Sequence, residues 1–219
     1  GLGLLRRVNF HVDLACVVPQ GDGVGPTNPC RPHQGLIHLQ HVGLAQFDCV
    51  VANPPFSLKN WGATEWASDS WGRHQIGGVP PKGYADWAWV QHMLTSASPA
   101  SGRVAVVLPP GALFRPGTEA RIRRHIIESD VIDAVIGLAP NLFYGTGLAA
   151  CVLILRLDKP HERRGKVLFI NGERLYKHGR NQNTLEPEHA QQLLDAYQAH
   201  ADSDSLSRLV DLNEVGSND

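Results

Sequence analysis

The residues best suited to chemistry are Asn53, Pro54, Pro55 and Phe56, which directly follow an apolar run at positions 47–52. The Asn53 side-chain oxygen and the Pro54 carbonyl both accept hydrogen bonds, and two consecutive prolines stiffen the backbone that aims them. An exocyclic amine held there would donate both hydrogens and keep its nitrogen lone pair free to attack an electrophile. Phe56 offers a flat ring on which a nucleobase can stack, a contact worth about 1–3 kcal/mol. The four residues therefore predict a pocket for an amino-bearing base.

A strand is expected to position this loop. Val50, Val51 and Ala52 are typical of a strand buried on both faces, as in a parallel sheet, and Pro54 must end it because proline has no N–H. Ligands of open α/β sheets bind at the carboxyl ends of such strands. The alternative is an ordinary turn, but by average amino-acid usage this tetrapeptide arises in roughly one chain per thousand of this length. The functional interpretation is favoured.

Asn-Pro-Pro-Phe after a strand resembles the catalytic motif of amino-group DNA methyltransferases that make N6-methyladenine. Further segments resemble the modification subunit of type I restriction–modification systems: residues 78–94, 106–115, 135–147, 163–171 and 179–183. The resemblance implies an α/β, Rossmann-like S-adenosylmethionine-dependent methyltransferase fold, of which this chain would hold the C-terminal half of the sheet. It also implies site-specific adenine-N6 methylation of DNA, with the target base flipped out of the duplex.

By the same resemblance, Asn53 and Pro54 would accept hydrogen bonds from the target amine and contact S-adenosylmethionine. Pro55 would stiffen the loop and Phe56 would stack on the base. We expect residues 47–219 to form a partial catalytic methyltransferase domain and residues 1–46 to be a poorly defined N-terminal remnant.

Other candidates for DNA contact lie on two loops. Residues 57–82 read as a long irregular segment in which three tryptophans alternate with cations such as Lys59 and Arg73. This pattern suits an extruded nucleic-acid strand, whereas the alternative is that the tryptophans anchor the loop to the domain or to another subunit. The resemblance places a second loop near the target base, so that Phe143 or Tyr144 would form the other face of the base pocket. The alternative is an aromatic side chain that plugs the sheet edge.

The rest of the chain alternates between strands and helices. The patterns predict strands at 103–108, 131–138 and 151–157 and helices at 84–96, 118–128 and 184–201. The second and third strands are expected to form a hairpin at the sheet edge. Residues 159–183 carry seven Lys/Arg against two Glu, which indicates either a solvated face or contact with phosphates.

Composition limits the partners and the compartment. The hydrophobic fraction is 42% and the net charge is −1. The overall charge therefore does not indicate a nucleic-acid-binding protein, and any contact with DNA must be local or shared with partner subunits. No apolar run is long enough to span a bilayer, so we expect a cytoplasmic protein with no membrane association. The family's partners would be DNA, a sequence-specificity subunit and a restriction subunit, in a hetero-oligomer.

Two patterns in the N-terminal part invite a different interpretation. The glycine-rich residues 21–25 are followed by prolines that forbid the helix a cofactor loop must open, so we interpret them as a turn. Cys30, His33, His38 and His41 could bind zinc, but their spacing matches no standard finger, and we expect no metal centre.

The family's glycine-rich S-adenosylmethionine loop is missing from the sequence. We therefore expect a fragment that binds the cofactor weakly and turns over poorly in isolation. A non-catalytic interaction module remains an alternative, as does methylation of another planar amino nitrogen such as cytosine N4 or a glutamine side chain.

Overall fold

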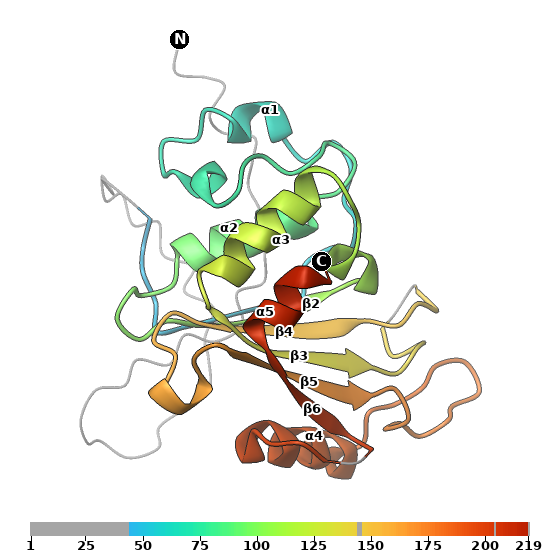
Figure 1. Cartoon of the computed structure of the whole chain (residues 1–219). Coiled ribbons are helices and arrows are strands. Elements are labelled where there is room, and N and C mark those ends of the chain that lie inside the picture. Colours follow the sequence, from blue (N-terminus) through green and yellow to red (C-terminus); the bar gives the residue numbers. More distant parts are fainter. Residues whose placement is uncertain (1–43, 144–145, 204, 219) are drawn as a thin grey trace, which may run out of the picture.

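The computed structural model of the chain describes residues 44–143, 146–203 and 205–218. Its centre is a six-stranded sheet in the order β1-β2-β4-β3-β5-β6 (Figure 1). The strands are β1 (Cys49–Ala52), β2 (Arg103–Leu108), β3 (Ile132–Leu138), β4 (Cys151–Arg156), β5 (Lys166–Gly172) and β6 (Ser207–Asp211).

Strand direction decides which loops meet. β1 pairs parallel with β2, and β3 pairs parallel with β5, whereas β4 runs antiparallel to both β2 and β3. Consequently β1, β2, β3 and β5 all point the same way, and β6 runs against them. The loops that follow these four strands leave from one edge of the sheet, where α/β proteins bind their ligands.

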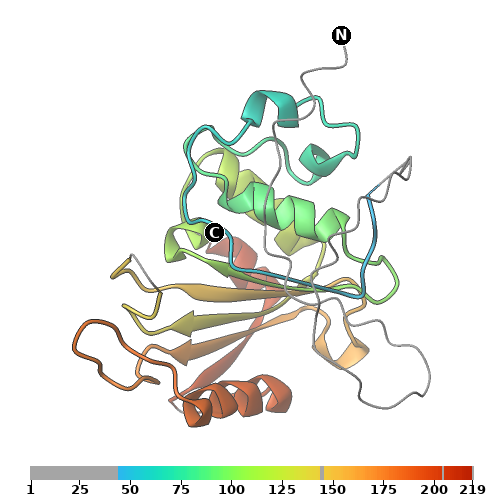
Figure 2. The ribbon, with the colours of Figure 1, turned by 180° about the vertical axis from the view of Figure 1, so that it is seen from behind.

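Helices cover the two faces unequally. The α-helices are α1 (Ala63–Trp66), α2 (Asp86–Thr95), α3 (Thr118–Glu128), α4 (Pro187–Ala199) and α5 (Leu212–Ser217), and the 3-10 helices are η1 (Arg73–Gln75), η2 (Pro110–Leu113) and η3 (His161–Arg163). α2, α3 and α5 lie on one face and α4 lies on the other, as Figure 1 and the view from behind in Figure 2 both show. The main core lies between the sheet and the helices α2, α3 and α5, and it includes Trp87, Ile122 and Leu153. Leu193 of α4 packs on the opposite face against Ile136 and Ile170.

Two expectations about the sheet are wrong, and a third segment holds a strand that was not expected. β1 is not buried on both faces, because Val51 is 37% exposed while Val50 and Ala52 pack under α2. The β3–β4 hairpin is not at the edge, because β5 and β6 extend the sheet beyond it. The basic segment 159–183, interpreted as either a solvated face or a contact with phosphates, also contains β5, whose Val167 and Leu168 are fully buried.

The predicted irregular segment 57–82 contains α1 and η1 and has its own small core. Trp61 and Trp66 meet edge to face, with ring centroids 5.4 Å apart, and pack with Trp89 of α2. The Trp61 indole also donates to the Pro81 carbonyl at 3.0 Å. These two tryptophans therefore anchor the segment to the domain, which was the alternative interpretation.

None of the helices in the described residues is long and apolar enough to cross a membrane. The glycine-rich turn at 21–25 and the residues Cys30, His33, His38 and His41 lie outside the described residues.

Candidate active site

The Asn53-Pro54-Pro55-Phe56 motif leaves the sheet at the carboxyl end of β1. Pro54 is buried, Phe56 is half-buried, and Asn53 and Pro55 are exposed. Within the described part of the chain, the Asn53 side chain makes no hydrogen bond. Burial of Pro54 fixes the backbone while the Asn53 amide stays open to a ligand, which is the arrangement that an acceptor for an incoming amine requires.

Phe56 faces Phe143, which lies on the loop after β3. Their ring centroids are 6.0 Å apart with planes inclined at 67°, an edge-to-face contact. The structure thus brings together two of the aromatic residues that the sequence singled out, from segments almost ninety positions apart. Tyr144, the other candidate, lies outside the described residues.

A buried carboxylate holds the end of the motif in place. Asp86, the first residue of α2, is 1% exposed and accepts a hydrogen bond from the Ser57 backbone N–H at 2.7 Å. Ser57 has a positive φ of 50°, a conformation that non-glycine residues rarely adopt. The Ala85 N–H also donates to the Leu58 carbonyl at 3.1 Å. The turn after Phe56 is therefore set by its bonds to the start of α2.

Arg115 ties this carboxylate to the loop after β2. Its guanidinium donates to Asp86 and makes two bonds to Glu119, at 2.7 and 3.0 Å, and it stacks on the Tyr84 ring. Burial alone would lower the pKa of Arg115, but the bonds and charges of Glu119 and Asp86 outweigh it and raise this pKa. The guanidinium thus stays charged and links the loops after β1 and β2.

Sequence reasoning missed this network. Its residues lie apart in the chain, at 57, 84–86 and 115–119. The usable signal was an acidic residue, Asp86, followed directly by Trp87 at the start of a buried helix, since a carboxylate beside a buried tryptophan needs a partner.

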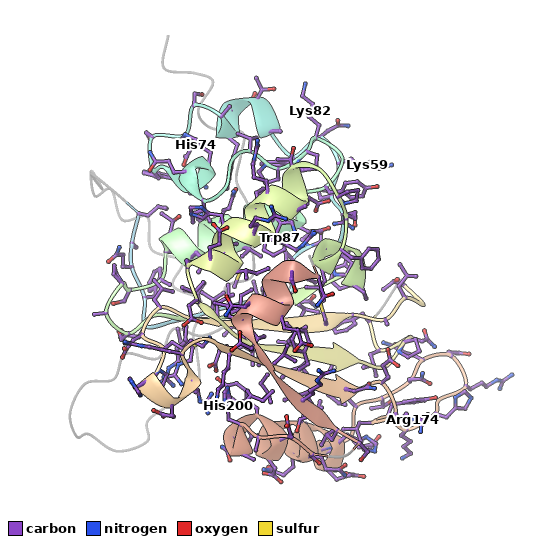
Figure 3. All side chains as sticks on the ribbon, viewed as in Figure 1. Lys59, His74, Lys82, Trp87, Arg174 and His200 are labelled. Atoms are coloured by element: carbon purple, nitrogen blue, oxygen red, sulfur yellow. The ribbon has the colours of Figure 1, made fainter. Side chains whose placement is uncertain are left out.

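The two predicted cationic contacts have different surroundings. Lys59 is exposed, and it lies near Lys82 on the loop beside the motif (Figure 3). Arg73 is instead 8% exposed, bonded twice to Asp69, and held between the Trp66 and Trp71 rings. These partners occupy the Arg73 guanidinium. The structure does not bring Arg73 together with the motif.

Comparison with known proteins places this geometry in context. The family model described as N-6 DNA Methylase matches residues 30–219. A type I restriction enzyme methylase subunit (MjaVII) of Methanocaldococcus jannaschii is 40% identical over 182 residues, covering 80% of this chain and 31% of the relative. The HindI methylase subunit of Haemophilus influenzae is 35% identical over 137 residues, covering 62% of this chain and 29% of the relative. The chain thus spans about a third of the length of these relatives.

Structural similarity agrees with the sequence matches. The crystal structure of a type I restriction-modification system methyltransferase subunit from Streptococcus thermophilus superposes with a TM-score of 0.73 at 33% identity. The match covers 80% of this chain and 36% of that protein. It confirms the predicted α/β methyltransferase fold. Since the family model covers most of the sequence, the chain belongs to the N-6 DNA methylase family.

Proposed function

We propose that this chain provides the base-handling part of a DNA adenine-N6 methyltransferase that uses S-adenosylmethionine and works in a restriction–modification system. The observation that carries the proposal is the arrangement at the end of β1. There the exposed Asn53 amide makes no hydrogen bond to the described residues, and Phe56, three residues on, meets Phe143. Membership of the N-6 DNA methylase family supports the same assignment.

The motif handles the target amine directly. An adenine must leave the duplex to reach it, because its amino group is otherwise stacked and paired. The Asn53 oxygen and the Pro54 carbonyl then accept the two N6 hydrogens, so that the nitrogen lone pair points away from the ring plane. S-adenosylmethionine, when bound, supplies an activated methyl group, and Asn53 and Pro54 are the residues of this chain that would face it. The open Asn53 amide fits that place, and positioning supplies much of the catalysis.

The aromatic pair must open before a base can enter. A base sandwiched between two rings needs roughly 7 Å between them, twice a van der Waals contact of about 3.5 Å, and the rings must be parallel. The observed centroid separation of 6.0 Å and inclination of 67° leave no such gap. Base capture therefore requires the two rings to separate, and Phe143 is the one expected to move because the turn after Phe56 is bonded to the start of α2.

The partners and compartment follow from this function. We assign DNA as substrate, a specificity subunit that reads the DNA sequence, and a restriction subunit, in a cytoplasmic hetero-oligomer. The exposed Lys59 would contact the DNA backbone beside the flipped base.

Product analysis tests the proposal. The methylase assembly containing these residues is incubated with duplex DNA and methyl-labelled S-adenosylmethionine, and the nucleosides are then separated by chromatography. The expected product is N6-methyladenine alone. Label in N4-methylcytosine or in protein would show instead that the pocket accepts another planar amine. No label in any fraction, with the DNA still bound, would make the chain an interaction module.

A further inference from the structure

The basic segment between positions 159 and 183 divides into two parts with opposite roles. In its first part, two of the four cations, Lys159 and Arg163, are structural. Lys159 is only 4% exposed, and its ammonium donates to Asp130 at 2.6 Å and to two backbone carbonyls. Arg163 is paired with the fully buried Asp133 at 2.8 Å. These two charges neutralise the partly exposed Asp130 and the buried Asp133 and are not available to a ligand.

The cations of the second part are not held in buried ion pairs. Arg174, Lys177 and Arg180 are exposed on the loop after β5, which we call the basic loop (residues 173–183). The ion pair that Lys177 makes, with Glu186 at 3.8 Å, is exposed and of little energetic weight. The basic loop therefore carries three exposed cations against one acidic residue, Glu173, at the sheet edge that carries the candidate active site.

The basic loop has a defined shape. The Lys177 N–H donates to the Thr184 carbonyl at 2.8 Å, and the Thr184 N–H returns a bond at 3.0 Å, so the two ends are joined. Within the loop, a side-chain carbon at Gly179 would lie 1.9 Å from the Gln182 carbonyl oxygen, which only glycine avoids. Lys177 and Arg180 thus stand on a closed turn, and Arg174 lies three residues before it.

The basic loop is also fastened to the loop that carries Phe143. Asn183 donates its backbone N–H to the Asn141 carbonyl and its side-chain amide to the Pro140 carbonyl, both at 2.9 Å. Gln182 donates to the Leu142 carbonyl at 2.7 Å. Phe143 directly follows Leu142. One hydrogen bond and one step along the chain therefore connect Gln182 of the basic loop to the aromatic pair.

Both loops extend past the ends of β3 and β5 on one side of the molecule (Figure 1). In Figure 3, Arg174 lies on this side below the strand ends, and Lys59 lies on the same side above them. Cations thus flank the strand-end edge on both sides of the loop that bears Phe143.

We propose that the basic loop binds the phosphate backbone of duplex DNA next to the flipped base, through Arg174, Lys177 and Arg180. This inference rests on the proposed function and adds a binding surface to it. Because backbone contacts fix the register of a protein on the duplex, a basic loop bonded to residues 140–142 couples phosphate binding to the position of Phe143.

The salt dependence of DNA binding tests this surface. Each phosphate that a cation neutralises contributes about 0.9 to the slope of log affinity against log salt concentration. The full chain is titrated into a fluorescein-labelled duplex at several NaCl concentrations and followed by anisotropy. The triple variant Arg174→Gln, Lys177→Gln, Arg180→Gln is expected to reduce the slope by about 2 to 3. Thermal melting confirms that it is folded.

A matched control separates a specific surface from net charge. Arg103, Arg124 and Lys166 are also exposed, but Arg103 and Lys166 begin β2 and β5 at the opposite edge, and Arg124 lies on α3. Replacing these three by Gln changes the net charge equally and is expected to leave the slope within about 0.5. Equal losses in both triple variants, or no loss in the first, would overturn the inference.

The outcome is separable from that of the proposed function. A reduced slope in the basic-loop variant supports the phosphate surface even where no methyl transfer is found. Transfer of methyl groups to adenine with an unchanged slope rejects the surface and leaves the function standing. Failure of the unmodified chain to bind the duplex rejects the surface outright.

Discussion

At the residue scale, Asn53 and Phe56 differ in the contacts that they already make. Asn53 is exposed and unbonded in the described chain, so its amide is available to a ligand. Phe56 already touches Phe143 and must exchange this contact for a base. Sequence chemistry identified both residues, because Asn-Pro-Pro-Phe after a strand has few structural uses. Arg73 shows the limit of such reasoning. A cation among tryptophans is consistent with a nucleic-acid contact, but it is equally consistent with what is found, a structural cation held between two rings.

The stacking role of Phe56 is testable by substitution. Phe56→Ala removes the ring on which the base rests, so the KM for DNA in a methyl-transfer assay should rise about tenfold, in line with about 1–3 kcal/mol per stacked base. Phe56→Trp keeps an aromatic plate and should stay close to the unmodified enzyme. A similar loss in both variants would mean that the site needs the shape of phenylalanine and that stacking is not its function.

At the element scale, the start of α2 sets the turn after the motif. Asp86 accepts from Ser57 and pairs with Arg115, which in turn is held by Glu119 of α3. Strands 103–108 and 131–138 and helix 118–128 could be predicted to within one residue, because long apolar runs and a clear helical stripe dominate there. The Asp86 network could not, because ion pairs between distant segments leave no periodic signal. β5 was hidden for a related reason: cations before and after its buried residues mask a short strand.

Two carboxylates on one guanidinium offer a matched pair of variants. Asp86→Ala and Glu119→Ala should each destabilise the fold by about 3 kcal/mol, since each removes a buried partner of Arg115. Only Asp86→Ala frees the Ser57 N–H. Hydrogen–deuterium exchange should therefore accelerate at Ser57 in this variant and stay slow in Glu119→Ala, relative to their global stabilities. Equal exchange in both variants would deny Asp86 its role in holding the motif.

At the scale of the whole molecule, strand direction brings the functional segments together. Four strands point to one edge, and from it leave the motif loop, the Arg115 loop, the Phe143 loop and the basic loop. The α/β class and the position of the motif were predictable from the sequence. The position of β4 between β2 and β3, and the addition of β5 and β6, could not be predicted. The order in which strands pair depends on which parts of the sheet the other elements cover.

The anchoring of residues 57–82 should also make stability depend on pH. Burial first, and then the charge of Arg73, lower the pKa of His92 from 6.5 to about 4. Below pH 6.5 the unfolded chain binds this proton and the folded chain does not, so stability falls as pH drops toward 4, by up to about 3 kcal/mol. His92→Gln should remove this part of the loss in denaturant titrations. The exposed His125→Gln serves as control, and identical pH profiles for all three proteins would exclude His92 as the cause.

The claim that Asn53 receives the amino group of a flipped adenine is tested most directly by methyl transfer from tritiated S-adenosylmethionine to duplex DNA. The assay compares the unmodified methylase assembly with Asn53→Ala and with Asn213→Ala, an exposed asparagine on α5. Loss of one preorganised hydrogen-bonding group should lower kcat about a hundredfold or more in Asn53→Ala and leave Asn213→Ala unaffected. Undiminished transfer by a folded Asn53→Ala assembly would contradict the account.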